Sequence, residues 1–347
     1  MTSQLPLTRK HTMKAMQLSA PGGLNHLQLT TLPAAPAPQA GEIQVRIHAS
    51  SLNYHDLLVA TLPHAAADGR IPMADGAGLV TAVGAGVTEF AVGDAVVSTF
   101  FPQWLSGKHV PSDFKRVPGD GVDGFARESI TLPATAFTHA PQGWSHAEAA
   151  TLTTAGLTAW RALVVNGHLQ AGDTVLVLGT GGVSIFALQI AKSMGARVIA
   201  TTSSATKAER LKALGADVVI NYQENPEWGN AVLAATNGRG ADIVVEVGGP
   251  GTLAQSIRAC AVGGHIALIG VLTGFAGSIP SAEMMAKQQT LQGLIVGSRE
   301  HQQDMLRALE QFGWKPVIDR SYPLEQLADA FRHQQSGQHF GKICLEY

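Results

Sequence analysis

Between about residues 174 and 312, short apolar runs alternate with segments of helical periodicity. Thr174–Leu178 is continuously apolar, as expected for a parallel strand that helices cover on both faces. The segment from Val183 to Met194 has helical periodicity and is followed by Gly195, a typical helix stop. A second helix is predicted at 207–214, and further strands at 197–202, 218–220, 242–247, 265–269 and 290–296. This order predicts an α/β domain with a doubly wound parallel sheet.

The flanking regions have a different pattern. Residues 13–137 are predicted to be β-rich, because short runs such as Ile43–Ile47 alternate between apolar and polar and are separated by Pro and Gly. Residues 313–347 return to short strands, with one helix around 324–333. We therefore predict one domain from 13–137 and 313–347, a second from 138–312, and a disordered leader at 1–12.

Composition excludes several classes of partner. The net charge is 24 − 26 = −2 over 347 residues, which argues against nucleic acid or a membrane surface bound through bulk charge. No apolar run reaches the roughly 18–20 residues of a membrane span. The two cysteines cannot form a disulfide framework or a four-thiolate zinc site, and they favour a reducing cytoplasm.

The strongest local motif closes the first strand of the parallel sheet and opens its helix. It reads Gly179-Thr-Gly181-Gly182-Val183-Ser184. Glycines allow the backbone close to a pyrophosphate, whose charge meets the free N–H groups of the helix N-terminus. Ser184 stands where a third glycine is usual, and its small side chain still permits close packing. We predict a dinucleotide site here; the alternative is a glycine-rich turn without a ligand.

The end of the second strand indicates which dinucleotide binds. NAD-binding proteins usually carry Asp or Glu about 20 residues beyond the glycines, where it binds the ribose hydroxyls. Here Thr202, Ser203, Ser204 and Lys207 supply hydroxyls and a cation instead. This set accepts a 2′-phosphate, so NADPH is predicted over NADH. Ser204 also suits a helix N-cap, and both roles can hold together.

These motifs and several others identify a family. Over about residues 14–347 the chain resembles the medium-chain dehydrogenase/reductase superfamily, and most of all its zinc-independent, quinone-oxidoreductase-like branch, often labelled NAD(P)-dependent alcohol dehydrogenase. The similar stretches also include Asn53-Tyr-His-Asp56, Asp75-Gly-Ala-Gly78, Val92-Gly-Asp94, Ala155 to Trp160, Leu214 to Asp217, Ile220-Asn-Tyr222 and Phe340-Gly-Lys342.

The resemblance implies a GroES-like catalytic domain interrupted by a Rossmann nucleotide-binding domain. It also implies a homodimer, with the strands near 290–296 as the expected pairing edge, and a small-molecule substrate. Tyr222 would contact the adenosine end of the cofactor, and Thr158 the nicotinamide. Loop contacts are expected from Val247, Gly248, Gly270 and Val271, with Gly297, Ser298 and Lys342 as weaker candidates.

Zinc ligands are missing from the positions that the resemblance assigns to them. Zinc-dependent relatives use Cys, His and Cys where this chain has Asn53, Ala74 and Thr154. None of these replaces a thiolate or imidazole at a tetrahedral zinc site. The structural-zinc lobe of those relatives would fall within 100–127, which contains no Cys. We therefore predict no metal.

Without a Lewis acid, the chemistry suits an acceptor that is already activated, such as a quinone or an α,β-unsaturated carbonyl. Asn53 is predicted to stabilise the oxygen on which negative charge develops during reduction; the alternative is that it only stabilises the local turn. Tyr54 is predicted to donate a proton, and the alternative is aromatic packing. Asp56 is predicted to order the turn. Some quinone-oxidoreductase relatives carry a Tyr where this chain has Leu58, which counts against a tyrosine mechanism. The alternatives are an NADP-dependent alcohol dehydrogenase or carbonyl reductase, and a non-catalytic NADPH-binding protein.

Overall fold

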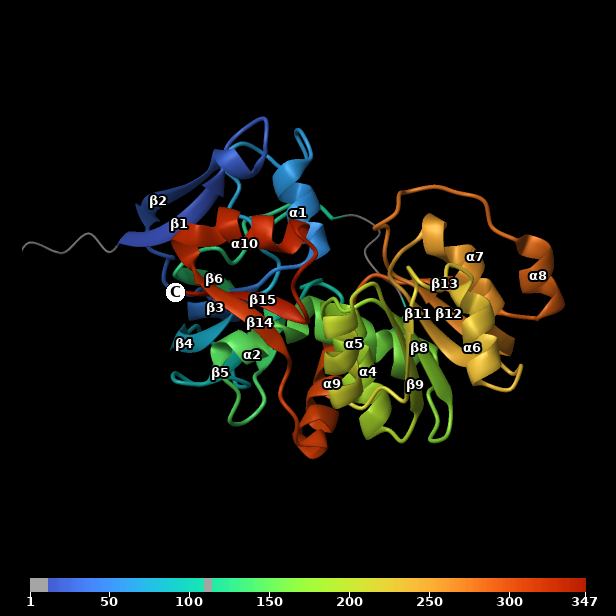
Figure 1. The fold of residues 1–347 in the computed structure, drawn as a ribbon. Coiled ribbons are helices and arrows are strands. Elements are labelled where there is room, and N and C mark those ends of the chain that lie inside the picture. Colours follow the sequence, from blue (N-terminus) through green and yellow to red (C-terminus); the bar gives the residue numbers. More distant parts are fainter. Residues whose placement is uncertain (1–11, 109–113) are drawn as a thin grey trace, which may run out of the picture.

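A computed structural model describes residues 12–108 and 114–347. The chain forms two lobes that lie side by side (Figure 1). The predicted leader lies outside the described residues except for Thr12. Thr12, which the prediction placed in the leader, is the first residue of strand β1. No described helix is both long enough and apolar enough to cross a bilayer.

The second lobe confirms the doubly wound fold. Its six strands are all parallel and lie in the order β10-β9-β8-β11-β12-β13. The strands are β8 (Thr174–Leu178), β9 (Arg197–Thr202), β10 (Val218–Asn221), β11 (Ala241–Glu246), β12 (Cys260–Leu268) and β13 (Thr290–Gly293). The helices are α4 (Gly182–Ser193), α5 (Ala205–Ala213), α6 (Trp228–Ala235), α7 (Pro250–Ala259), α8 (Ser281–Ala286) and α9 (Arg299–Phe312). The order of the strands reverses between β8 and β11, and a dinucleotide binds at the carboxyl ends of the strands at such a switch.

The first lobe is a largely antiparallel β structure, as its alternating sequence predicts. A seven-stranded sheet has the order β14-β15-β3-β4-β5-β7, and β6 also pairs with β3. Its strands are β3 (Glu42–Ser51), β4 (Ala77–Val83), β5 (Ala95–Ser98), β6 (Ser129–Pro133), β7 (Phe137–His139), β14 (Ile318–Pro323) and β15 (Lys342–Glu346). A separate hairpin pairs β1 (Thr12–Leu18) with β2 (Leu27–Pro33), helix α1 spans Tyr54–Thr61, and helix α10 spans Leu327–Gln335.

The carboxyl-terminal segment returns to the first lobe. Strand β15 pairs antiparallel with β3, with Cys344 opposite Ser51. Lys342, at the start of β15, is thereby placed beside the chain that leaves β3 at Leu52 and Asn53. Before β15, Gly341 forms a parallel bridge with Gly181 of the glycine turn. Two distant motifs of the sequence therefore meet at the boundary between the lobes.

A long helical run connects the lobes. It comprises α2 (His146–Ala150), a π-helical turn (Leu152–Gly156), α3 (Leu157–Trp160) and a second π-helical segment (Arg161–Asn166). π-turns inside helices are frequent at functional sites, because they redirect side chains. This run carries Thr154, Thr158 and Arg161.

The last strand of the parallel sheet is shorter than predicted. It ends at Gly293, and the predicted strand over 290–296 is wrong at its end. Val296 has a φ of 46°, a left-handed conformation that a β-branched residue rarely adopts. Beyond the end of the strand, Arg161 Nη1 donates to the carbonyls of Ile295 and Val296 at 3.2 Å each.

Candidate active site

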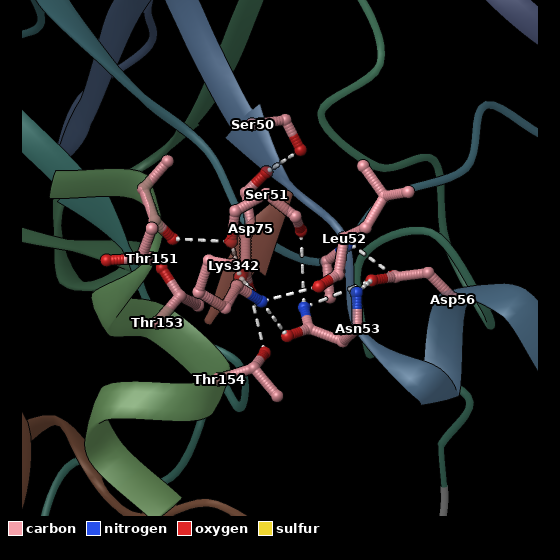
Figure 2. Close-up of polar contacts among 12 residues, drawn as sticks. Ser50, Ser51, Leu52, Asn53, Asp56, Asp75, Thr151, Thr153, Thr154 and Lys342 are labelled. Atoms are coloured by element: carbon pink, nitrogen blue, oxygen red, sulfur yellow. Dashed lines mark hydrogen bonds and ion pairs between the residues drawn. The ribbon is translucent and has the colours of Figure 1, made fainter. Parts of the chain in front are cut away.

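A buried polar network lies where the first lobe meets the second (Figure 2). At its centre is the ammonium of Lys342, which is 3% exposed. It donates to the Leu52 carbonyl and, at 2.6 Å, to Asn53 Oδ1, and it lies 3.9 Å from Asp75 Oδ2. The aliphatic stem of Lys342 packs against the glycine turn, since a Cβ on Gly182 would lie 2.5 Å from Lys342 Cδ.

Asp75 and Asp56 surround this ammonium. Asp75 accepts hydrogen bonds at 2.6 Å from Ser51 Oγ and at 2.6 Å from Thr154 Oγ1. Asp56 accepts from the Asn53 and Ala74 backbone N–H groups at 3.0 and 2.9 Å. Burial raises the pKa of each carboxyl to about 6, although Lys342 opposes the shift in both. Burial lowers the pKa of Lys342. The network therefore contains one buried cation and two buried carboxyl groups that interact with it electrostatically.

The orientation of the Asn53 amide follows from its neighbours. An ammonium has donors only, so the amide oxygen must face Lys342. The Asn53 NH₂ group then donates at 3.0 Å to Asp56 Oδ2 and at 3.3 Å to the Ser51 carbonyl. Asn53 also directly precedes α1 and is its N-cap residue. Asp56, in the first turn of α1, completes the cap by accepting a hydrogen bond from the Asn53 N–H. Asn53 and Asp56 thus orient the entrance of α1, where Tyr54 is 37% exposed.

The donor set does not fit a zinc ion. The three positions assigned to zinc ligands by resemblance do converge here: Asn53 binds Lys342, Thr154 binds Asp75, and Ala74 binds Asp56. However, they contribute an amide, a hydroxyl and a backbone N–H, and an ammonium lies among them. Zinc sites use thiolate, imidazole and carboxylate ligands, and a buried cation repels a second one. Among the described residues, no cluster of three or more His, Cys, Asp or Glu side chains could hold a metal ion.

The glycine turn fits a pyrophosphate. Gly179 has a φ of 72°, and a Cβ added at Gly179 or Gly181 would meet no atom within 4 Å, so the turn is open to a ligand. Helix α4 begins at Gly182, and its first N–H groups are those that a helix leaves unpaired. Ser184, in the place of the third glycine, is buried and donates at 2.6 Å to the Leu178 carbonyl. Val183 is half-buried in the first turn of the same helix.

The residues predicted for the adenosine end lie together. Tyr222 follows β10, is 41% exposed, and its N–H donates at 3.0 Å to the Thr202 carbonyl at the end of β9. Ser204 caps α5, because its Oγ accepts a hydrogen bond from the Lys207 N–H at 3.3 Å. This confirms the predicted N-cap role of Ser204. Lys207 Nζ donates at 2.6 Å to the Gly337 carbonyl across the lobe boundary. Ser203, between them, is half-buried.

A cavity of about 580 Å³ lies at the carboxyl ends of β12 and β13. Gly270 and Val271 line it from the second lobe, and Phe101 and Phe114 from the segment between β5 and β6. Of the remaining predicted contacts, Val247 and Gly248 follow β11 directly, and Gly270 approaches so closely that a Cβ would lie 1.7 Å from the Val247 carbonyl oxygen. Thr158 is buried in α3, whereas Gly297 and Ser298 directly precede α9, with Ser298 as its N-cap.

Two functional candidates escaped the sequence interpretation. The first is His55, whose Nε2 lies 3.4 Å from Asp120 Oδ2 and whose ring stacks on Phe114 with 5.2 Å between ring centroids. Burial lowers the pKa of His55, while Asp120 and then Asp75 oppose the shift. The second is Arg161, which lines the cavity; no motif in the neighbouring sequence marks it as a functional residue. Asp120 lies 65 residues from His55, so no local pattern could have paired them.

Comparison with known proteins establishes the family. A model of the alcohol dehydrogenase GroES-like domain matches residues 39–142, and a model named zinc-binding dehydrogenase matches residues 182–312. A zinc-type alcohol dehydrogenase-like protein of Schizosaccharomyces pombe is 40% identical over 317 residues, which is 88% of this chain and 91% of that protein.

Comparison with solved structures gives the same family. A protein from Sinorhizobium meliloti named for the alcohol dehydrogenases is 42% identical, with a TM-score of 0.91 over 97% of this chain and 99% of that one. A structure named as an NAD-dependent alcohol dehydrogenase is 35% identical, with a TM-score of 0.86 over 96% and 99% of the two chains. The chain belongs to the zinc-type alcohol dehydrogenase-like family of the medium-chain dehydrogenase/reductases, and is an NAD(P)-dependent oxidoreductase.

Proposed function

We propose that the chain is a zinc-independent, NADPH-dependent oxidoreductase of the quinone-oxidoreductase-like type. It transfers hydride to an activated acceptor, a quinone or an α,β-unsaturated carbonyl. The observation that carries the proposal is the Lys342 ammonium, which lies hydrogen-bonded among the three positions where zinc-dependent relatives hold their metal. A site without a Lewis acid cannot activate an unreactive alcohol in this way, so the substrate must supply its own polarisation.

The dinucleotide would be held by the glycine turn and the end of β9. Gly179, Gly181 and Gly182 admit the pyrophosphate, while Ser203, Ser204 and Lys207 surround the 2′-phosphate. When bound, the nicotinamide supplies the hydride. The residues of the chain orient the acceptor in the 580 Å³ cavity, whose walls are largely apolar.

The first turn of α1 supplies the proton that completes the reduction. Asn53 and Asp56 fix the start of this helix through buried hydrogen bonds, so we assign them positioning roles. Two neighbours on that turn can donate a proton: the exposed Tyr54 phenol and the His55 imidazolium beside Asp120. His55 is the stronger candidate because its ring packs on Phe114, a wall of the cavity.

A pH profile distinguishes these two donors. If His55 donates, only its protonated form is active, and burial holds its pKa below the ordinary 6.5. Acceptor reduction should therefore decline as pH rises through that pKa, and His55→Gln should be slowed about 10²-fold or more and lose this limb of the profile. Tyr54→Phe, the matched control, should retain it. A profile unchanged in His55→Gln would assign the proton to another group.

An acceptor panel tests the function itself. Purified protein analysed for metal should oxidise NADPH faster than NADH with quinones and enones, and a chelator should not reduce the rate. Turnover of simple alcohols with NADP⁺, abolished by the chelator, would contradict the proposal. Oxidation of neither nucleotide despite tight NADPH binding would instead indicate the non-catalytic alternative.

An alcohol dehydrogenase or carbonyl reductase is the second candidate. It is favoured by the names of the relatives, one of which is described as an NAD-dependent alcohol dehydrogenase. The same panel, extended to aldehydes, decides this case: turnover of alcohols or aldehydes in preference to quinones and enones would favour it.

We further propose a homodimer paired at β13, the strand at the free end of the parallel sheet. Large apolar side chains are exposed near this edge, including Phe275 and Met285, each 75% exposed. Light scattering on the protein prepared for the panel should give the molar mass of two chains; the mass of one chain would refute the dimer.

A further inference from the structure

Arg161 is the single charged residue that lines the 580 Å³ cavity, as far as the described residues show. Apolar side chains such as Leu253, Ile279 and Ile295 make up most of the wall, and Ser278 supplies the other polar side chain. Arg161 is half-buried, so its guanidinium loses part of its hydration without gaining an opposite charge, which is unfavourable. Its presence therefore requires an explanation in the ligand or in the fold.

The fold supplies hydrogen-bond acceptors for only some of the N–H groups of this guanidinium. Arg161 Nη1 donates at 3.2 Å to each of the Ile295 and Val296 carbonyls, and the group lies 5.0 Å from the centroid of the Trp104 ring. Its Nε is buried and has no hydrogen-bond acceptor among the described residues. No described carboxylate forms an ion pair with it. Burial lowers the pKa of the guanidinium, and His301, whose own pKa is lowered by burial and then by Arg161, offers no negative charge.

We propose that Arg161 forms an anion subsite in the acceptor cavity, and that the physiological acceptor carries a carboxylate on an apolar body. A guanidinium presents paired N–H groups whose geometry matches a carboxylate. One cation balances one negative charge, which favours a monoanion over a phosphate dianion. The apolar wall then receives the remainder of the molecule. This inference rests on the proposed reduction of an activated acceptor and specifies its substrate class.

A matched pair of acceptors tests the subsite. trans-3-Benzoylacrylate is an enone with a carboxylate, and its methyl ester has the same body without the charge. We expect the wild-type protein to reduce the acid with a kcat/KM about tenfold or more above that of the ester, mainly through KM. Arg161→Met should lose this preference while ester reduction changes by less than about twofold to threefold. Arg161→Lys, which keeps the charge, should retain part of it.

A binding measurement separates this inference from the proposed function. Calorimetry of 3-benzoylpropionate, the reduced acid, on the NADP⁺-loaded protein needs no turnover. Binding by the wild type and its loss in Arg161→Met would support the subsite even if the panel found no reduction. Reduction of both acceptors without preference for the acid would refute the subsite and leave the proposed function standing.

Two further outcomes would assign Arg161 to the fold. An equal loss for acid and ester in Arg161→Met would show that the guanidinium only holds the backbone of Ile295 and Val296. A weaker dimer with an unchanged acid-to-ester ratio, seen by light scattering, would show that a second copy neutralises it. NADPH fluorescence titration of each variant verifies that the cofactor site remains intact.

Discussion

Lys342→Met should destabilise the protein by about 3–5 kcal/mol at pH 7.5, because the substitution leaves a buried carboxylate without its cation. In the native network the Lys342 ammonium donates to Asn53 Oδ1 and the Leu52 carbonyl and lies 3.9 Å from Asp75 Oδ2. Both Lys342 and Asp75 are almost completely buried, so water cannot replace the lost partner. Urea denaturation measures the change in the free energy of unfolding.

The pH dependence of this loss follows from the carboxyl groups. The pKa of Asp75 is already raised to about 6 by burial, and removal of Lys342 raises it further. The folded variant therefore binds a proton more readily than the folded wild type, and its stability relative to the wild type improves as the pH falls. The deficit measured at pH 7.5 should shrink at pH 5.5. An equal deficit at the two pH values would mean that packing of the lysine stem, rather than charge, is what the variant loses.

Two companion variants isolate the ion pair. Lys192→Met removes a lysine paired at 2.8 Å with Asp217, but both side chains are about one-third exposed, so the cost should stay below about 1 kcal/mol. Asp75→Asn combined with Lys342→Met removes both charges and should recover part of the loss, because the remaining groups can hydrogen-bond as neutral partners. A double variant as unstable as the sum of the two single variants would exclude coupling between Asp75 and Lys342.

The parallel sheet and its cofactor turn could be predicted because their information is local. Strand β8 occupies the predicted Thr174–Leu178, β9 the predicted 197–202, and α4 begins within one residue of its expected start. Each is determined by an apolar run bounded by glycine. The hydroxyl set at the end of β9 is local too, since Ser203, Ser204 and Lys207 lie within five residues.

The buried network could not be predicted because its members are distant in sequence. Lys342 lies 289 residues from Asn53, and only the pairing of β15 with β3 brings them together. The sequence shows Asn53, Ala74 and Thr154 at the positions of the zinc ligands, but it does not show that the Lys342 ammonium binds Asn53 there. Motif comparison had placed Lys342 among the weaker cofactor contacts. The structure places its stem against Gly182 and its ammonium on Asn53, so it contacts the glycine turn and the buried polar network at once.

Lys207→Glu should reverse the selection between the two nicotinamide cofactors. Lys207 lies in the first turn of α5, next to the Ser204 cap and near the end of β9 at Thr202. The sequence has no acidic residue at this strand end that could bind the ribose hydroxyls of NADH. The first acid of this region, Glu209, is exposed and paired with Lys212 at 2.8 Å. If Lys207 binds the 2′-phosphate, we expect kcat/KM for NADPH to fall about 10- to 100-fold, as is typical for a lost hydrogen bond to a charged group.

The ratio of the two cofactors is the informative quantity, because Lys207 also has a structural contact. Its Nζ donates to the Gly337 carbonyl across the lobe boundary, and loss of that bond should affect NADPH and NADH alike. Lys212→Glu, on the same helix and with the same change of charge, is the matched control and should leave the ratio within about threefold. A parallel decline for both cofactors in Lys207→Glu would reduce the role of this lysine to joining the lobes. The preference for NADPH would then have to come from Thr202 and Ser203 alone.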